Sequence, residues 1–428
     1  MILERLSVLN FWISLSRRNK NGNEMPNRVH LTRIAKSNDA MIVHQIKENY
    51  MKTINISLRK TSMKKYLLLL IVGLATGSLS IAQKQSDDAS DYQTKSFTVQ
   101  KGGMLDVDVE PGSVRIEPWS KDEVMVEAEG IDERHPDRLK MTQSGNNVMV
   151  HYKDSRHNVD HLVFTIKVPS QFNVGIQTSG GSVKQNDVLT GDFTAETRGG
   201  SIKIDHIIGK VDVETGGGSI KIDKVEGNTV MQTGGGSIDA AAVTGTVSAK
   251  TGGGSITLRE VGGKVNASTG GGSVKVENTK EWIDVSTGGG SVYVRGAKYG
   301  AKVRTGGGSI EMEDITGVVN VSTGGGSIRC ELTPGMKGNS TITTGGGEIQ
   351  LSLPENAKCI VEATIKHDGG RGRRHKKYSI HSDFKSDKYE NDEDSGHIYA
   401  MYSLNGGGPT ITLETSESDI EILKISSH

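Results

Sequence analysis

Residues 215–220 read Thr-Gly-Gly-Gly-Ser-Ile, and close copies of this hexapeptide follow at intervals of 18 residues. A short sequence repeated at so strict a period predicts stacked coils of chain, in which each coil packs mainly against its neighbours. The threonines that open the copies form a predicted structural ladder: Thr215, Thr233, Thr251, Thr269, Thr287, Thr305 and Thr323. We expect their hydroxyls to bond to each other or to the corner backbone.

The remainder of each repeat predicts strands. In the coil that begins at Ser219, apolar and threonine side chains recur mostly at spacings of two, which is the period of a β-strand, and no column recurs at a helical period. The predicted inward residues of this coil are Ile220, Ile222, Val225, Thr229, Met231 and Thr233. A second glycine column marks a turn on the far side of most coils, although Glu281 and Tyr299 replace it in two of them.

The glycine triplets are predicted corners. Glycine loses more backbone freedom on folding than any other residue, so three in a row indicate a need for positive φ or for close backbone approach. The predicted corner glycines are the central ones: Gly217, Gly235, Gly253, Gly271, Gly289, Gly307 and Gly325. One coil buries too few side chains to offset the entropy of ordering it, so neighbouring coils must supply hydrogen bonds and packing. The predicted fold is all-β, a single-domain parallel β-solenoid, or β-helix, with 18-residue coils and degenerate capping coils.

The repeat also predicts the domain boundaries. Near-perfect repeats cover residues 197–332, and weaker copies on both sides extend the solenoid domain to residues 96–427, with a linker at 83–95. Degenerate coils are expected at 107–116, 178–183, 344–349 and 411–422. Residues 366–397 are a charged loop insertion, basic in its first half and acidic in its second. This insertion is either a surface loop or a hairpin closed by opposite charges.

Residues 63–82 resemble a secretory signal. They combine Lys64 and Lys65, a short apolar run at 67–74 and small residues before a cleavage site expected after Ala82. The run is too short for a comfortable membrane span, so we expect no integral span after signal removal. The predicted location is exported, meaning periplasmic, at the cell surface or secreted.

Residues 1–62 precede this segment and are predicted to be a disordered extension. Either the start codon has been assigned too far upstream and Met63 is the true start, or the segment at 63–82 is an internal anchor with a basic cytoplasmic tail. Removal of residues 1–82 leaves 38 basic and 47 acidic residues, a formal charge of −9. This charge argues against nucleic-acid binding.

Cofactor and metal sites are not expected. Phosphate-binding glycine loops precede a helix, whereas a strand follows each triplet here and no Gly-Lys-Ser/Thr motif occurs. Calcium-binding repeats need aspartate shortly after the glycines, where this chain has lysine, threonine or tyrosine as often as an acid. Cys330 and Cys359 lie in different coils and are predicted to be buried free thiols.

One outward column carries charged residues. In its middle, arginine and glutamate alternate one coil apart, which predicts a surface ion-pair ladder of Arg259, Glu277, Arg295 and Glu313. The alternative is a catalytic cleft of a polysaccharide-degrading β-helix around Asp205 and Asp223. The 18-residue coils carry no long loops to wall a cleft, which favours the structural interpretation.

Several of these segments together resemble the bacterial putative-adhesin family of envelope β-solenoids. The resemblance rests on the signal segment, the strand region at 97–109, Val168-Pro169 leading into residues 174–183, and the repeated glycine hexapeptide. It implies the solenoid fold and says little about activity. We expect a structural or adhesive role at the cell envelope, without enzymatic activity. The alternatives are a glycan-binding or polysaccharide-degrading β-helix and an envelope-stress-associated scaffold. The expected partner is an envelope protein or a glycan; handedness and oligomeric state stay open.

Overall fold

The computed structural model describes residues 9–18, 24–33, 92–131, 135–154, 162–367, 378–392 and 396–425. The chain divides into two compact units, Met1–Asp88 and Ala89–His428. The predicted signal segment at 63–82 lies outside the described residues.

The first unit contains two strands that the sequence analysis did not expect. β1 (Leu9–Arg18) pairs antiparallel with β2 (Glu24–Arg33) within the segment predicted to be disordered. The sequence does contain a strand pattern here, because Phe11, Ile13 and Leu15 alternate with other residues at the strand period. The expectation of disorder is therefore corrected for these two segments.

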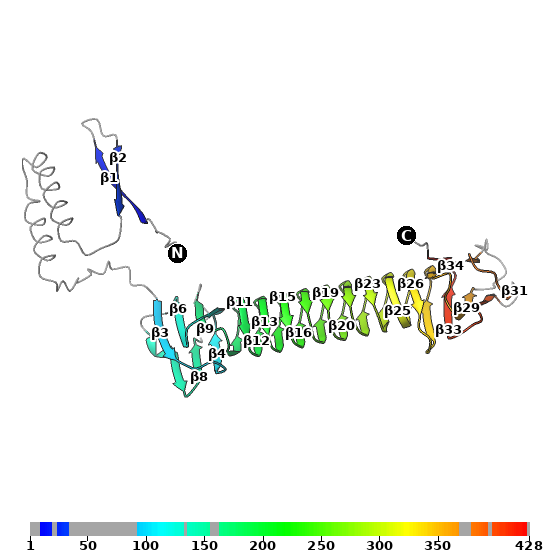
Figure 1. Cartoon of the computed structure of the whole chain (residues 1–428), viewed down its shortest axis with the longest axis horizontal. Helices are drawn as coiled ribbons and strands as arrows, with labels where there is room; N and C mark the ends of the chain where they lie inside the picture. Colours follow the sequence, from blue (N-terminus) through cyan, green and yellow to red (C-terminus); the bar gives the residue numbers. More distant parts are fainter. Residues whose placement is uncertain are drawn as a thin grey trace, which may run out of the picture. The chain divides into compact units, whose positions relative to one another are not determined.

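Each regular coil of the second unit forms two strands, one in each of two parallel sheets (Figure 1). The regular strands of the first sheet are β11 (Val183–Thr190), β13 (Ile202–Ile208), β15 (Ile220–Glu226), β17 (Ile238–Val243), β19 (Ile256–Val261), β21 (Val274–Thr279), β23 (Val292–Ala297), β26 (Ile328–Pro334) and β28 (Ile349–Leu353). Those of the second sheet are β10 (Asn173–Thr178), β12 (Phe193–Thr197), β14 (Val211–Thr215), β16 (Thr229–Thr233), β18 (Val247–Thr251), β20 (Val265–Thr269), β22 (Ile283–Thr287), β24 (Gly300–Thr305) and β27 (Ser340–Thr344). β25 (Ile310–Thr323) runs through both sheets.

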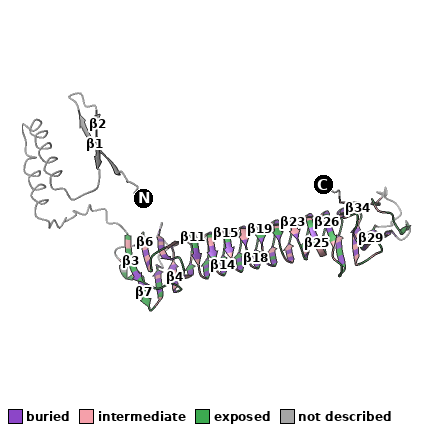
Figure 2. Cartoon of the chain, in the orientation of Figure 1, coloured by how far each residue is buried: buried purple, intermediate pink, exposed green. Residues whose placement is uncertain are grey.

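The coils stack in register. Ile220 lies opposite Ile238, and Thr251 lies opposite Thr269, so equivalent residues of neighbouring coils face each other directly. All six predicted inward residues of the coil at 219–233 are buried, at 2% exposure or less. Buried and exposed residues alternate along the strands (Figure 2). The predicted parallel β-solenoid is confirmed.

The N-terminal end of the solenoid does not follow chain order. Its elements are β3 (Tyr92–Thr98), β4 (Met104–Glu110), β5 (Ser113–Trp119), β6 (Glu123–Glu129), the 3-10 helix η1 (Pro136–Arg138), β7 (Leu139–Ser144), β8 (Asn147–Lys153) and β9 (Val163–Pro169). The coil β4–β5 is inserted between β8–β9 and β10–β11, with parallel pairing on both sides. The antiparallel strands β3, β6 and β7 then cover the outermost edges.

The C-terminal end repeats this arrangement. Its elements are β29 (Cys359–Lys366), β30 (Ile380–Ser382), β31 (Lys388–Asp392), β32 (His397–Leu404), β33 (Thr410–Ser416) and β34 (Ile420–Lys424). The last coil in the sequence, β33–β34, is inserted between β27–β28 and β29–β30. β31 and β32 form an antiparallel pair beyond β29, so the acidic half of the charged insertion contributes to a hairpin. The basic stretch at 371–377 lies outside the described residues.

η1 is the one helical element in the described part of the chain, and it spans three residues. No helix among the described residues is long and apolar enough to cross a membrane.

The glycine corners stack at backbone contact distance. A Cβ atom on Gly218 would lie 2.1 Å from the carbonyl oxygen of Gly200, and one on Gly216 would lie 2.3 Å from that of Arg198. By contrast, a Cβ atom on the central Gly217 would meet nothing within 4 Å, and the φ of Gly217 lies outside the left-handed region. Close approach therefore requires the outer two glycines of the triplet. The central glycines lie in the bends as predicted, but the expected need for close approach falls on the outer two.

The buried threonines join successive corners. The Thr233 hydroxyl donates to the carbonyl oxygen of Gly218 at 2.7 Å and accepts the N–H of Gly236 at 3.2 Å. Because Gly218 belongs to the preceding coil and Gly236 to the coil of Thr233, each hydroxyl links two coils. The same pair of bonds occurs throughout the predicted ladder. Further donors at the degenerate coils are Thr178, Thr197, Thr344 and Thr415.

We predict that Gly218→Ala destabilises the protein by at least about 2 kcal/mol, because the new methyl group overlaps a backbone carbonyl that cannot move alone. The neighbouring Gly217→Ala is the matched control and should stay within about 1 kcal/mol of the parent. Urea unfolding followed by circular dichroism measures both. Equal stabilities of the two variants would contradict the close-approach explanation.

We also predict that Thr233→Val costs about 1–3 kcal/mol, because it leaves the partly buried carbonyl of Gly218 and N–H of Gly236 without this partner. Thr229 provides the control on the same strand: it is equally buried, and its hydroxyl has no hydrogen-bond partner. Thr229→Val should be neutral or stabilising. Thermal unfolding of the two variants distinguishes the loss of the Thr233 hydrogen bonds from a general intolerance of valine in this strand.

Candidate functional site

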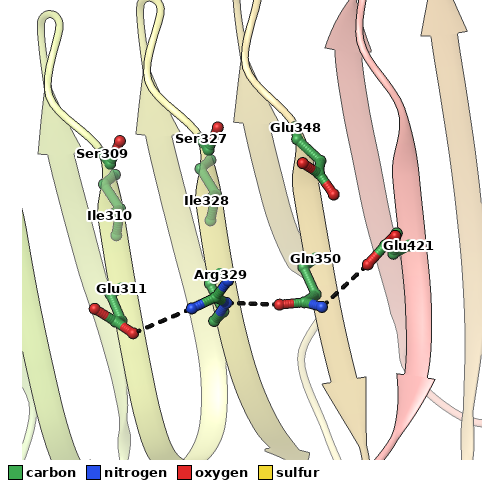
Figure 3. A pocket seen from close by; sticks show the side chains of 9 residues that line it. All are labelled: Ser309, Ile310, Glu311, Ser327, Ile328, Arg329, Glu348, Gln350 and Glu421. Atoms are coloured by element: carbon green, nitrogen blue, oxygen red, sulfur yellow. Dashed lines mark hydrogen bonds and ion pairs between the residues drawn. The ribbon is translucent and has the colours of Figure 1, made fainter. Parts of the chain in front are cut away.

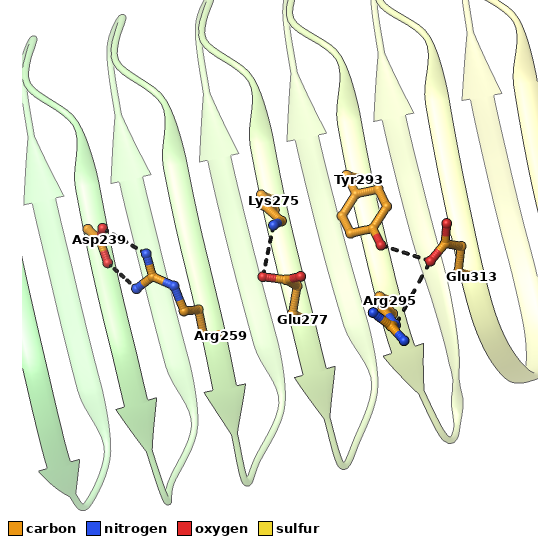
Figure 4. A network of polar contacts seen from close by, with 7 residues as sticks. All are labelled: Asp239, Arg259, Lys275, Glu277, Tyr293, Arg295 and Glu313. Carbon is orange, nitrogen blue, oxygen red and sulfur yellow. Dashed lines mark hydrogen bonds and ion pairs between the residues drawn. The ribbon is translucent and has the colours of Figure 1, made fainter.

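The outer surface of the first sheet carries a network of polar contacts (Figure 4). Arg259 donates to both carboxylate oxygens of Asp239, at 2.6 and 3.1 Å, and the hydrogen-bonded carboxylate raises the pKa of Arg259. In the strand register Asp239 lies opposite Thr257, so the pair spans neighbouring strands diagonally. Long side chains reach such diagonal positions readily.

The other contacts of this network lie within one strand, on a diagonal, or directly across two strands, as for Arg295 and Glu313. Glu277 pairs with Lys275 at 3.0 Å on its own strand. Glu313 accepts a hydrogen bond of 2.8 Å from the Tyr293 hydroxyl and lies 3.9 Å from Arg295. Burial raises the pKa of Tyr293, and the hydrogen bond to Glu313 raises it further.

The predicted ion-pair ladder is corrected by this geometry. Of its four members, the structure pairs Arg295 with Glu313, whereas Arg259 and Glu277 turn to other partners. All these charges are at least partly solvated, so each pair contributes little to stability. Asp205 and Asp223 are engaged as well. Asp205 accepts the backbone N–H of Asp187 at 3.0 Å, and Asp223 lies 3.8 Å from Lys221.

A groove of about 360 Å³ lies on the first sheet near the C-terminal end (Figure 3). One polar side chain from each of four stacked strands, β25, β26, β28 and β34, follows its floor in line. Glu311 lies 3.6 Å from Arg329, which donates to Gln350 at 2.6 Å; Gln350 in turn donates to Glu421 at 3.0 Å. The remaining lining residues are Ser309, Ile310, Ser327, Ile328 and Glu348.

Glu348 is the residue of the groove that departs from the repeat. It occupies the position after the glycines where the preceding coils have serine, as at Ser309 and Ser327. Its carboxylate is exposed and makes no ion pair or side-chain hydrogen bond with the described residues. The substitution of serine by glutamate at 344–349 was visible in the sequence. What the sequence could not show is that Glu421, distant along the chain, joins the same groove.

Two further hollows, of about 360 and 70 Å³, lie on the second sheet near the N-terminal end. Gly175 lies in the larger one, in an outward column beside Asp106 and Thr194, and the end of the Met104 side chain lies over it. The surrounding acidic residues are Asp106, Asp108, Glu110, Glu196, Asp212 and Glu214. No group of three potential metal ligands occurs within the described ranges.

Both cysteines are buried free thiols, as predicted. Cys330 occupies the inward column of Met312 and Leu351. Burial raises the pKa of Cys330 to about 12 and that of Cys359 to about 11. Neither thiol therefore has the thiolate character of a nucleophile or metal ligand at neutral pH.

Comparison with known families identifies the solenoid. Residues 103–281 match the family model described as Toastrack DUF4097. This segment is similar to the Toastrack family. The match begins just before β4 and ends between β21 and β22, within the run of regular coils rather than at its end. No curated protein sequence matches the chain.

Solved structures that resemble this chain share little of its sequence. A putative adhesin from Parabacteroides distasonis is 14% identical, covers 61% of this chain and 98% of its own, and has a TM-score of 0.31. A putative adhesin from Bacteroides fragilis is 11% identical, covers 78% and 97%, and has a TM-score of 0.21. A putative cell adhesion protein from Clostridium sporogenes is 9% identical, covers 78% and 100%, and has a TM-score of 0.16. At these scores the likeness does not bear on activity.

We predict that neither thiol of the folded protein reacts with iodoacetamide at pH 8, because the reactive thiolate is absent below the raised pKa values. Both should react in urea, giving two additions by mass spectrometry. The unfolded sample is the control for reagent activity. Rapid modification of the native protein would contradict the buried placement of these residues.

Proposed function

We propose that this chain is a non-enzymatic exported module of the bacterial cell envelope that adheres to an envelope glycan or protein through the outer wall of its solenoid. The observation that carries the proposal is the groove of about 360 Å³ with its line of polar side chains. Export is supported by the signal-like segment at 63–82. The Toastrack solenoid supplies the rigid support.

Stacking places the residues of the outer wall at regular intervals. Neighbouring coils lie about 4.8 Å apart, so an elongated ligand lying along the stack would meet one floor residue per coil. Glu311, Arg329 and Gln350 alternate acceptor and donor groups at this spacing. Planar side chains of this kind form paired hydrogen bonds with neighbouring hydroxyls, as sugars present them. Many modest contacts along a rigid wall give useful affinity without a deep pocket.

An adhesive role fits the groove better than hydrolysis does. Glu311 and Glu421 are held by Arg329 and Gln350, and Asp205 and Asp223 are engaged in separate surface contacts. Glycoside hydrolysis requires two carboxyl groups that face one scissile bond from opposite sides. The floor residues instead lie in a row along one surface. A scaffold role in envelope stress would use the same wall and differs only in its partner.

A glycan array probed with the full chain tests this proposal, followed by an assay for new reducing ends on each bound glycan. We expect binding without release of product. Glu348→Ser restores the residue of the neighbouring coils and should leave folding intact while weakening binding about tenfold or more, the effect of losing a charged hydrogen bond. Glu260→Ser, on β19 outside the groove, is the matched control.

Two outcomes would contradict the proposal. Reducing-end release that is lost in Asp205→Asn or Asp223→Asn would make the chain an enzyme. Binding of neither glycans nor any protein in envelope extract, by a chain whose circular dichroism shows intact strands, would remove the adhesive role.

A further inference from the structure

The corner opposite the glycine triplets changes character along the solenoid. In the regular coils it consists of glycine and small polar residues, as in Gly227-Asn228 and Gly245-Thr246. Later coils depart from this pattern with larger residues and with the insertion before β27. We call this region the lysine corner; it comprises residues 262–264, 280–282, 298–300, 316–318 and 333–339.

Large apolar side chains project from the lysine corner. Met336 is 96% exposed and Tyr299 is 70% exposed, the two highest values among the large apolar residues described. Trp282 and Val318 are half-buried beside them. Isolated exposed apolar residues need no explanation, but a run of them over consecutive coils marks an interaction surface.

Two glycines make room for this run. A Cβ atom on Gly300 would lie 2.9 Å from the Trp282 ring, and one on Gly338 would lie 2.7 Å from a methyl group of Val318. The side chains of Trp282 and Val318 therefore lie over the backbone of the following coils. These two side chains thus extend apolar surface from one coil onto the next.

Lysines flank this apolar run. The lysine corner contains four of them and one acidic residue, Glu281, a net charge of +3, whereas residues 83–428 together carry −9. All four are exposed, and no ion pair joins any of them to a described residue. They are Lys264, Lys280, Lys298 and Lys337.

We propose that the lysine corner docks the solenoid onto the surface of an anionic lipid bilayer. Tryptophan and tyrosine favour the membrane–water boundary, and lysines beside them are attracted to acidic headgroups. The lysine corner projects from the side of the solenoid, and none of the three hollows described above includes any of its residues. Protein anchors usually fill pockets, whereas projecting apolar side chains can enter the headgroup layer directly.

The orientation that follows keeps the rest of the molecule free. Each strand of the first sheet runs from the glycine corner to the lysine corner, so docking by the lysine corner turns the glycine corner away from the bilayer. The stack would lie along the membrane, with the polar groove on one side of it. This inference is independent of what the groove binds.

Co-sedimentation of the full chain with vesicles tests the docking. We expect binding to vesicles of equimolar phosphatidylglycerol and phosphatidylcholine, weakened by salt, and much weaker binding to phosphatidylcholine alone. Replacing the four lysines by glutamine should lower the affinity about fivefold for each charge removed. The double variant Tyr299→Ser/Met336→Ser should also lower it. The charge-matched control replaces Lys140, Lys184, Lys203 and Lys250, which are exposed elsewhere.

A second readout locates the contact, because the apolar run at 67–74 could itself enter lipid. Brominated phosphatidylglycerol should quench tryptophan emission from the bound protein, and Trp282→Phe should remove most of this quenching. The two remaining tryptophans, Trp12 and Trp119, report any other contact. Circular dichroism of each variant confirms that it is folded.

Three results would overturn the proposal. The lysine variant could bind vesicles as tightly as its control variant. Quenching could persist unchanged in Trp282→Phe. Finally, the lysine and apolar variants could instead abolish self-association in solution, which would make the corner a contact between copies of the chain.

Discussion

Backbone contact between stacked corners is the constraint on which this solenoid depends. The carbonyl oxygen of one corner lies where the Cβ atom of the next would be, so the outer glycines of each triplet are sterically required. The buried threonine hydroxyl then accepts an N–H from its own corner and donates to the corner before it. The same two bonds recur at each corner of the predicted threonine ladder. The glycine corner and its threonine thus fix both the spacing between coils and their register.

The two ends of the stack must cover the open edges of the parallel sheets. A parallel sheet that simply stopped would expose a row of unpaired backbone groups and invite pairing with other chains. Here the first and last coils in the sequence are inserted one level inside the stack, and antiparallel strands cover the outermost positions. Each terminal segment therefore has a parallel neighbour on both sides. At the C-terminal end this insertion also brings Glu421 beside Gln350 and so completes the groove.

The regular coils form the support, and departures from the repeat form the distinctive surfaces. Glu348 replaces a serine and faces the groove, while Tyr299 and Trp282 replace small residues at the opposite corner. These positions tolerate change because their side chains lie outside the stack. The buried columns vary less in polarity, since an unpaired polar group there would be costly. The buried Gln185 is paired with backbone groups. Thr229 and Thr279 are buried hydroxyls without a partner in the described structure, and they mark where this rule is relaxed.

The sequence by itself determined the solenoid, the inward columns and the degenerate coils at 107–116 and 411–422, because a period of 18 residues and a strand period of two are local properties of the chain. It did not determine which glycine of the triplet is required, because that depends on a carbonyl 18 residues away. The partner of Arg259 followed from diagonal side-chain reach and that of Glu277 from a contact within its own strand, rather than from column order. Only the tertiary structure decided the order of the terminal coils, and with it the groove, because strand insertion joins residues that no repeat relates.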